Sequence, residues 1–143
     1  MRYGLPSAFE ELAHTADVGV RARGAVLAEA YARTALAMAQ LQAGGGALEP
    51  LEERELQARG EDRASLLVDL CRQVLRVFWL ERRLLAALEV TSLSDTALTA
   101  RAWLCPFDPE RHGEGVDLKA VTYARAAMEA KEGGYEGTLI FDI

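Results

Sequence analysis

Hydrophobic residues recur at helical spacing in two segments of the chain, and the first of these segments covers residues 25–42. It is rich in alanine, which is the best helix former. Its larger apolar residues fall on one side of a helix: Leu27, Tyr31, Ala35, Met38 and Leu41. The three glycines 44–46 follow as a stop signal and a connector. The pattern therefore predicts a helix that ends just before residue 44.

The second helical segment, residues 62–83, has the strongest periodicity in the chain. Asp62 is a good N-cap residue, because its carboxylate can accept from the free N–H groups of the first turn. The apolar side of this segment consists of Leu66, Leu67, Leu70, Val74, Val77 and Phe78, and its polar side carries Arg72, Gln73 and Arg76. An amphipathic helix that packs on a sheet is expected here.

Most of the remaining chain has the composition of β-strands. Residues 8–23 predict one or two strands broken at His14–Asp17, and residues 51–59 predict a charged strand at a sheet edge. Four more strands are expected at residues 84–93, 97–105, 116–130 and 135–143, and the short turns between neighbours favour antiparallel pairing. Residues 105–115 form a loop that we expect to be too polar to be buried. The pattern as a whole predicts an α+β fold, a single domain over residues 1–143 with two helices packed on a mixed, largely antiparallel sheet.

Composition narrows the classes of function. The 143 residues are 50% hydrophobic and 27% charged, which is typical of one globular domain. A net charge of -6 argues against a protein that grips a nucleic-acid backbone by itself, although a basic partner could still bring it to RNA. The apolar stretches are too interrupted to span a membrane, and the N-terminus lacks the apolar core of a signal peptide. Cys71 and Cys105 are too few for structural zinc and fit a reducing compartment, so a cytoplasmic protein is expected.

Three carboxylates are candidates for a metal site. Asp17 interrupts an apolar strand segment, and Asp142 follows the apolar run 139–141. The apolar Ile143 next to it suggests a held chain end, which would place the α-carboxylate of that residue beside Asp142. Calcium, magnesium and manganese prefer oxygen ligands of this kind, and carboxylates that gather without a cation repel one another. By residue pattern alone, Asp17 is also consistent with an ordinary turn or cap residue.

Lys119 and His14 are the other candidates for chemistry. Lys119 lies inside a predicted strand, where lysine is disfavoured unless it points to solvent or has a function. His14 stands beside Thr15, and a hydrogen-bonded structural role competes with any role as ligand or base. Neither glycine-rich stretch, 44–46 or 112–115, has the spacing of a phosphate-binding loop, and no nucleophile elbow is present.

Several motifs together resemble the archease family. They are FEELAHTADVGVRARG at residues 9–24, the helix LLVDLCRQVL at 66–75, PFDPERHG at 106–113, DLKAVTY at 117–123 and the final IFDI. The resemblance covers essentially the whole chain, with the motifs in the family's order. HTADVG, KAVTY and the final FDI are specific only in combination.

The resemblance implies an accessory factor with no enzymatic turnover of its own. Archeases assist the RtcB-type RNA ligase, the GTP-dependent enzyme of tRNA splicing and RNA repair, by promoting its guanylylation and repeated turnover. RNA would then be met only through the ligase, and no membrane is involved. The resemblance also implies a divalent-cation site made of Asp17, Asp142 and the carboxylate of Ile143, and a functional Lys119.

Two departures from the family pattern affect which site residues of the family can be assigned to this sequence. Ala13 stands where many relatives have an acidic residue, so the site is expected to be less anionic here. Ala124 stands where a histidine is frequent, so no role of that histidine transfers. His14 matches the motif, and its role is left open.

Two other functions compete with the accessory factor. The same carboxylates could activate water in a metal-dependent phosphohydrolase, but the sequence has no candidate base with a supporting partner. A chaperone-like interaction domain is the third hypothesis, and it rests on the fold alone. Nucleotide or phosphoester hydrolysis by the purified protein would favour the enzyme over the accessory factor.

Overall fold

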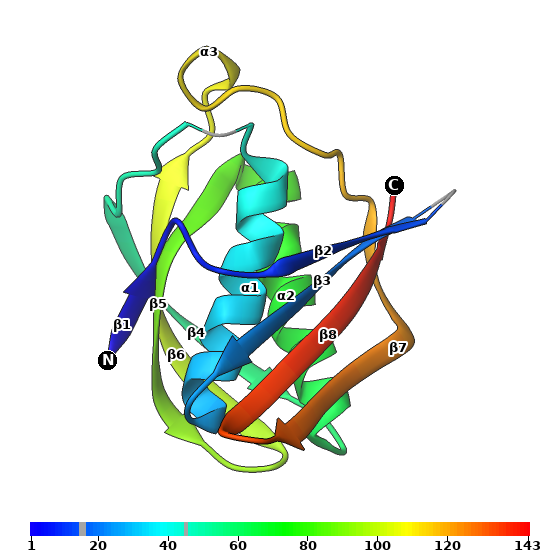
Figure 1. Ribbon diagram of the computed structural model, residues 1–143. Coiled ribbons are helices and arrows are strands. Elements are labelled where there is room, and N and C mark those ends of the chain that lie inside the picture. Colours follow the sequence, from blue (N-terminus) through cyan, green and yellow to red (C-terminus); the bar gives the residue numbers. More distant parts are fainter. Residues whose placement is uncertain (15–16, 45) are drawn as a thin grey trace.

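The computed structural model describes residues 1–14, 17–44 and 46–143, apart from the side chains of Ala13 and His14 (Figure 1). The strands are β1 (Arg2–Gly4), β2 (Glu10–His14), β3 (Asp17–Gly24), β4 (Glu52–Arg59), β5 (Arg83–Leu93), β6 (Ala97–Pro106), β7 (Ala120–Lys131) and β8 (Gly134–Asp142). The helices are α1 (Leu27–Gln42), α2 (Arg63–Glu81) and the short α3 (Pro109–His112). Both long helices and the strands that follow α2 lie where the sequence predicts them.

The strands form two four-stranded sheets, ordered β1-β5-β6-β4 and β2-β3-β8-β7. Every strand pair formed by the described residues is antiparallel. The predicted α+β class is therefore confirmed, and β4 does lie at an edge. The expected single mixed sheet is corrected to two antiparallel sheets, because among the described residues β2, β3, β7 and β8 pair with one another and not with the other four strands.

Helices α1 and α2 lie between the two sheets (Figure 1). Helix α1 contacts β3 and β8 on one side and β5 on the other, and α2 contacts β7 on one side and β4 on the other. Alanine on several sides of α1 allows this close approach, and the helix is buried around most of its circumference. A helix covered on two sides must be apolar on both, and α1 meets that condition with few charged residues.

The ends of α2 show why its boundaries are sharp. The Asp62 carboxylate accepts a hydrogen bond from the Ser65 backbone N–H at 2.8 Å, and the Ser65 hydroxyl accepts one from the Asp62 N–H at 3.0 Å. This reciprocal capping box satisfies N–H groups that the first turn of a helix leaves free. At the other end, Arg82 adopts a left-handed conformation with φ 54°, which ends the helix and starts β5.

The capping contact predicts a pH dependence of stability. Hydrogen bonds from Ser65 hold the pKa of Asp62 below its ordinary value of 3.8. Because the folded-state pKa is the lower one, the contribution is complete above the unfolded pKa and is lost as the pH falls through the folded value. We expect the melting temperature of the wild type to fall between about pH 5 and pH 3 more steeply than that of Asp62→Asn, which keeps an acceptor but does not titrate. Parallel pH profiles of the two proteins would contradict this assignment.

The segment 105–115 differs from its expectation. Residues 109–112 form the short helix α3, and His112 is only 3% exposed. Its Nδ1 accepts a hydrogen bond from the Asp108 backbone N–H at 3.0 Å, so the ring proton lies on Nε2, which is 3.8 Å from Cys105 Sγ. The expectation that this polar loop avoids burial is therefore wrong at His112, because the imidazole finds partners within its own loop.

The cysteines behave as the sequence predicts. Cys71 and Cys105 are free thiols, and both are buried. Burial raises the pKa of the Cys71 thiol, as expected of an inert core residue.

In the described part of the chain, no helix is both long and apolar enough to cross a membrane.

Candidate functional site

One end of the β2-β3-β8-β7 sheet brings together most of the predicted site residues. The backbone register pairs His14 with Asp17, Asp17 with Asp142, and Asp142 with Ala120. These four positions form a single row across all four strands. Directly opposite residues of antiparallel strands have neighbouring Cβ atoms and share one side of the sheet, so the Asp17 and Asp142 side chains lie on the same side.

The row lies on the outer side of the sheet, away from the helices. The next row, formed by Val18, Phe141 and Val121, is buried against the helical layer. Because side chains alternate between the two sides of a strand, the preceding row must face outward. Asp17 is accordingly half-buried and Asp142 is exposed. Both carboxylates can reach a ligand from solvent.

The segment before β7 fixes the end of this sheet. The Lys119 backbone N–H donates to the Asp142 carbonyl oxygen at 2.8 Å, which continues the β7–β8 ladder by one bond. Ile143 follows Asp142 and is 46% exposed. Asp142 is therefore paired with β3 on one side and with β7 on the other. Ile143 is the next residue in the sequence.

The predicted ligands are carboxylate oxygens, which are the type of ligand that hard cations prefer. Among the described residues, no ion pair involves Asp17 or Asp142. No group of three or more His, Cys, Asp or Glu side chains that could hold a metal gathers within that same part of the chain. Calcium and magnesium accept the carboxylate oxygens predicted from the sequence together with water.

The other two predicted residues lie beside the aspartate pair in different ways. The side chain of Lys119 is exposed and lines an open hollow against α2, together with Arg76 and Trp79. Its backbone N–H is bonded to Asp142, whereas its side chain lies with residues of α2 around that hollow. The backbone of His14 lies in the row next to Asp17, and its side chain is outside the described part of the structure.

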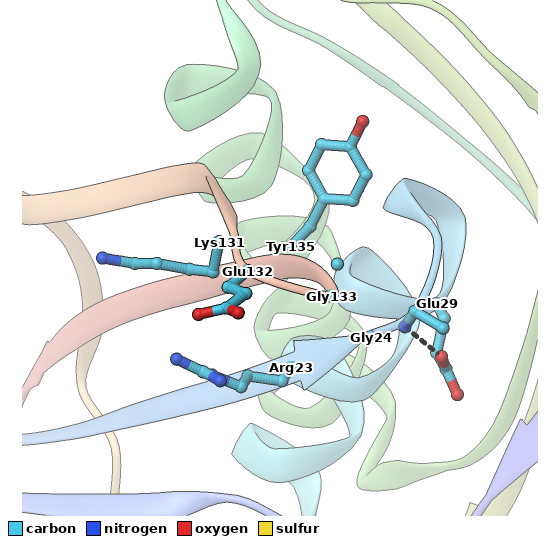
Figure 2. Close-up of a pocket in the computed structure, with 9 residues that line it drawn as sticks. Arg23, Gly24, Glu29, Lys131, Glu132, Gly133 and Tyr135 are labelled. Atoms are coloured by element: carbon cyan, nitrogen blue, oxygen red, sulfur yellow. Dashed lines mark hydrogen bonds between the residues drawn. The ribbon is translucent and has the colours of Figure 1, made fainter.

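A second hollow occupies the opposite end of the same sheet, between the β7–β8 turn and the start of α1 (Figure 2). Its cations are already engaged: Arg23 pairs with Glu136 at 2.9 Å, and Lys131 pairs with Glu129 at 3.3 Å. Glu29 accepts from the Ala25 backbone N–H and so closes the N-terminus of α1, as the dashed line in Figure 2 shows. None of the residues predicted from the sequence lines this hollow.

Comparison with known proteins agrees with the motifs that meet at this sheet end. The model of the Archease protein family matches residues 9–143. The chain belongs to the archease family. The protein archease of Sulfurisphaera tokodaii is 33% identical over 136 residues, which cover 94% of this chain and 98% of the relative. Protein archease of Pyrococcus abyssi is 31% identical over 139 residues, with the same shares of the two chains covered.

Solved structures show that the archease fold extends over the chain described above. The solution structure of Methanobacterium thermoautotrophicum protein 1598 is 29% identical, with a TM-score of 0.77 over 94% of this chain and 98% of the other. A crystal structure from Thermotoga maritima, described as an archease and possible chaperone, covers 94% of this chain and 96% of its own at 19% identity and a TM-score of 0.56. The latter supports the fold alone.

Sequence reasoning missed a group of exposed residues on α2. Trp79 is 41% exposed and Leu80 is 71% exposed, although both are large apolar side chains. The signal was present in the sequence, because these two residues follow the apolar position Phe78 and continue the helix outside its buried stripe. They line the same open hollow as Lys119.

Proposed function

We propose that this protein is a metal-binding accessory factor of a GTP-dependent RNA ligase of the RtcB type. It promotes guanylylation of the ligase and its repeated turnover, and it performs no catalysis of its own. The ligase acts in tRNA splicing or RNA repair, and RNA meets this protein only through that partner. The proposal rests on membership of the archease family and on the geometry of one sheet end.

The observation that carries the proposal is the register of β3 against β8. It sets Asp17 directly opposite Asp142 on the outer side of the sheet, at the end where Lys119 is bonded to the same residue. These residues come from three separate motifs that are far apart along the chain. Folding brings them together at a rim that a partner can reach.

The protein's own groups would act by binding and positioning. Asp17, Asp142 and the Ile143 carboxylate would hold a divalent cation, which supplies positive charge that a phosphate or carboxylate of the partner's site can share. The net charge of -6 favours encounter with a basic cleft, such as a site that binds GTP and RNA phosphates. Opposite charge accelerates that encounter more than it strengthens the final complex.

The test of this function is a guanylylation assay of the cognate ligase with and without the protein. We expect a higher rate of ligase–GMP formation and more ligation cycles per ligase molecule when the protein is present. A ligase that gains neither would overturn the proposal. Metal-dependent hydrolysis of a nucleotide or phosphoester by the protein alone would replace it with the enzyme hypothesis, and prevention of ligase aggregation without any gain in rate would replace it with a chaperone role.

Lys119 provides a residue-level prediction for the same assay. Lys119→Ala removes the ammonium group and keeps the backbone N–H that bonds Asp142, so the sheet end should remain intact. We expect most of the stimulation to be lost, while the melting temperature changes little because exposed lysines contribute little to stability. Lys131→Ala is the matched control, since Lys131 is the other lysine of the chain and lies at the far end of β7. Equal stimulation by the two variants would assign Lys119 to the solvated surface.

A further inference from the structure

An exposed face between α2 and the start of β7 combines aromatic, apolar and cationic side chains. We call it the α2–β7 face, and it consists of Arg72, Arg76, Trp79, Leu80, Arg82, Lys119 and Tyr123. Trp79, Leu80 and Tyr123 are 41%, 71% and 59% exposed. Between the helix and the strand lies an open hollow whose base includes the buried side chains of Leu75 and Val121. The face lies where α2 packs against β7.

The cations of this face stand out because they have no acidic partner in the part of the chain that the structure describes. Within the described residues, no carboxylate lies at ion-pair distance from Arg72, Arg76, Arg82 or Lys119. Most arginines elsewhere are paired; Arg54, for example, bonds Glu81 at 2.6 Å and Glu52 at 2.9 Å. A protein with a net charge of -6 thus keeps a group of uncompensated cations on one face.

The aromatic rings of the face are held in place. The Trp79 indole N–H donates to the Leu118 carbonyl oxygen at 3.2 Å, and the Arg82 guanidinium lies 5.3 Å from the indole centroid. Arg72 lies 4.6 Å from the Tyr123 ring centroid and donates to the Val121 carbonyl oxygen at 3.1 Å. Rings that are fixed before binding lose little conformational entropy when a partner covers them.

We propose that the α2–β7 face is a docking surface for an acidic region of a partner protein, which under the proposed function is the RNA ligase. The proposal rests on that function for the identity of the partner. Tryptophan, tyrosine and arginine are the residues that dominate binding energy in protein interfaces. Unpaired arginines around an apolar hollow complement a surface that presents carboxylates around an apolar side chain.

The chemistry of the face favours a protein over single-stranded RNA. Base stacking needs open ring surfaces, whereas Arg82 and Arg72 each cover one side of the two exposed rings. Leu80 and the apolar base of the hollow offer nothing to a phosphate chain. The overall negative charge also opposes nucleic-acid binding beyond this local patch.

The α2–β7 face lies next to the end of the sheet that carries Asp17 and Asp142. Lys119 lines the hollow with its side chain and bonds Asp142 with its backbone, so the two surfaces share one residue. A partner seated on the α2–β7 face would present its neighbouring surface to the aspartate row. Apart from Lys119, the two surfaces consist of different residues, so mutations at those other residues are expected to separate docking from stimulation.

The test measures equilibrium binding of the full-length variants to the cognate ligase, in parallel with guanylylation. Arg76→Glu and Leu80→Glu change exposed side chains, and each should weaken binding about tenfold or more, with the stimulation at saturating protein unchanged. Arg59→Glu is the matched control: it makes the same charge change on an exposed arginine at the end of β4, one that has no ion pair within the described residues, and it should bind like the wild type. Asp142→Asn should lower the saturating stimulation without a comparable loss of binding.

The outcomes separate this proposal from the proposed function. Ligase binding that weakens in both face variants but not in Arg59→Glu supports the docking surface, even if the wild type gives no stimulation and the function fails. Wild-type stimulation with unchanged binding in both face variants overturns the docking surface and leaves the function standing. The docking surface is also overturned if Arg76→Glu abolishes binding of a single-stranded oligoribonucleotide, or self-association of this chain, while ligase binding is unaffected.

Discussion

Replacing Asp142 with asparagine should remove most of the divalent-cation binding and most of the ligase stimulation. The substitution keeps the size of the side chain but exchanges a charged oxygen ligand for a neutral amide, and hard cations bind carboxylates more strongly. Asp17→Asn should have the same effect, because the register places the two carboxylates opposite each other. Calorimetric titration with calcium, magnesium and manganese, followed by the guanylylation assay, measures both consequences.

The same site makes a more specific prediction about the Ile143 carboxylate. Two residues added after Ile143 convert that carboxylate into an amide carbonyl and move the negative charge away from the row. The cation affinity should fall about tenfold or more, since even outer-shell partners of metal ligands are worth about 10–100-fold. The same two residues added before Met1 provide the control. Equal affinity and stimulation in both extended proteins would remove Ile143 from the ligand set.

Stability measurements distinguish a lost ligand from a damaged fold. Both aspartates lie on the outer side of the sheet, so neither supports the buried core. Without metal, Asp17→Asn and Asp142→Asn should melt at the wild-type temperature or slightly above it, because one of two neighbouring like charges is gone. Asp117→Asn, a nearby exposed aspartate outside the row, should change neither metal binding nor stimulation. A large loss of stability in either row variant would mean that the carboxylates are structural.

The largest expected change in stability comes from the middle of α2. Leu70 is fully buried between the two sheets, and Leu70→Ala should lower the free energy of unfolding by about 2–5 kcal/mol through lost transfer energy and the cavity left behind. Arg76→Ala, on the exposed side of the same helix, should change it by less than about 0.5 kcal/mol. Chemical denaturation measures both values. Equal losses would contradict the orientation of the helix.

The structure also corrects the expectation that Arg72 contributes as little to stability as Arg76. The helical pattern places Arg72 on the polar side with Arg76, which makes both appear equally neutral to substitution. In the structure Arg72 is exposed but donates to the Val121 carbonyl oxygen and covers the Tyr123 ring. Arg72→Ala is therefore expected to cost more than Arg76→Ala, because it leaves a strand carbonyl and a ring without their partner.

The sequence pattern alone is sufficient to predict those helices and strands that are defined by residues close together along the chain. The period of the apolar positions identified α1 and α2, and the glycines and Asp62 marked where they end and begin. The alternation and the short turns likewise identified most of the strands. The combination of HTADVG, KAVTY and the final FDI indicates the family and selects Asp17, Asp142 and Lys119 without any information from the fold.

The spatial relations among these elements depended on contacts between distant residues. The division into two sheets follows from which strands pair, and the β3–β8 pair joins segments about 120 residues apart. The burial of His112 depends on partners that the folded loop supplies, and the α2–β7 face exists only because β7 packs beside the helix. Short-range periodicity describes which side of an element is apolar, whereas register and sheet order are chosen by packing over the whole chain. The opposition of Asp17 and Asp142 is a matter of register, and so the candidate site was complete only in the tertiary structure.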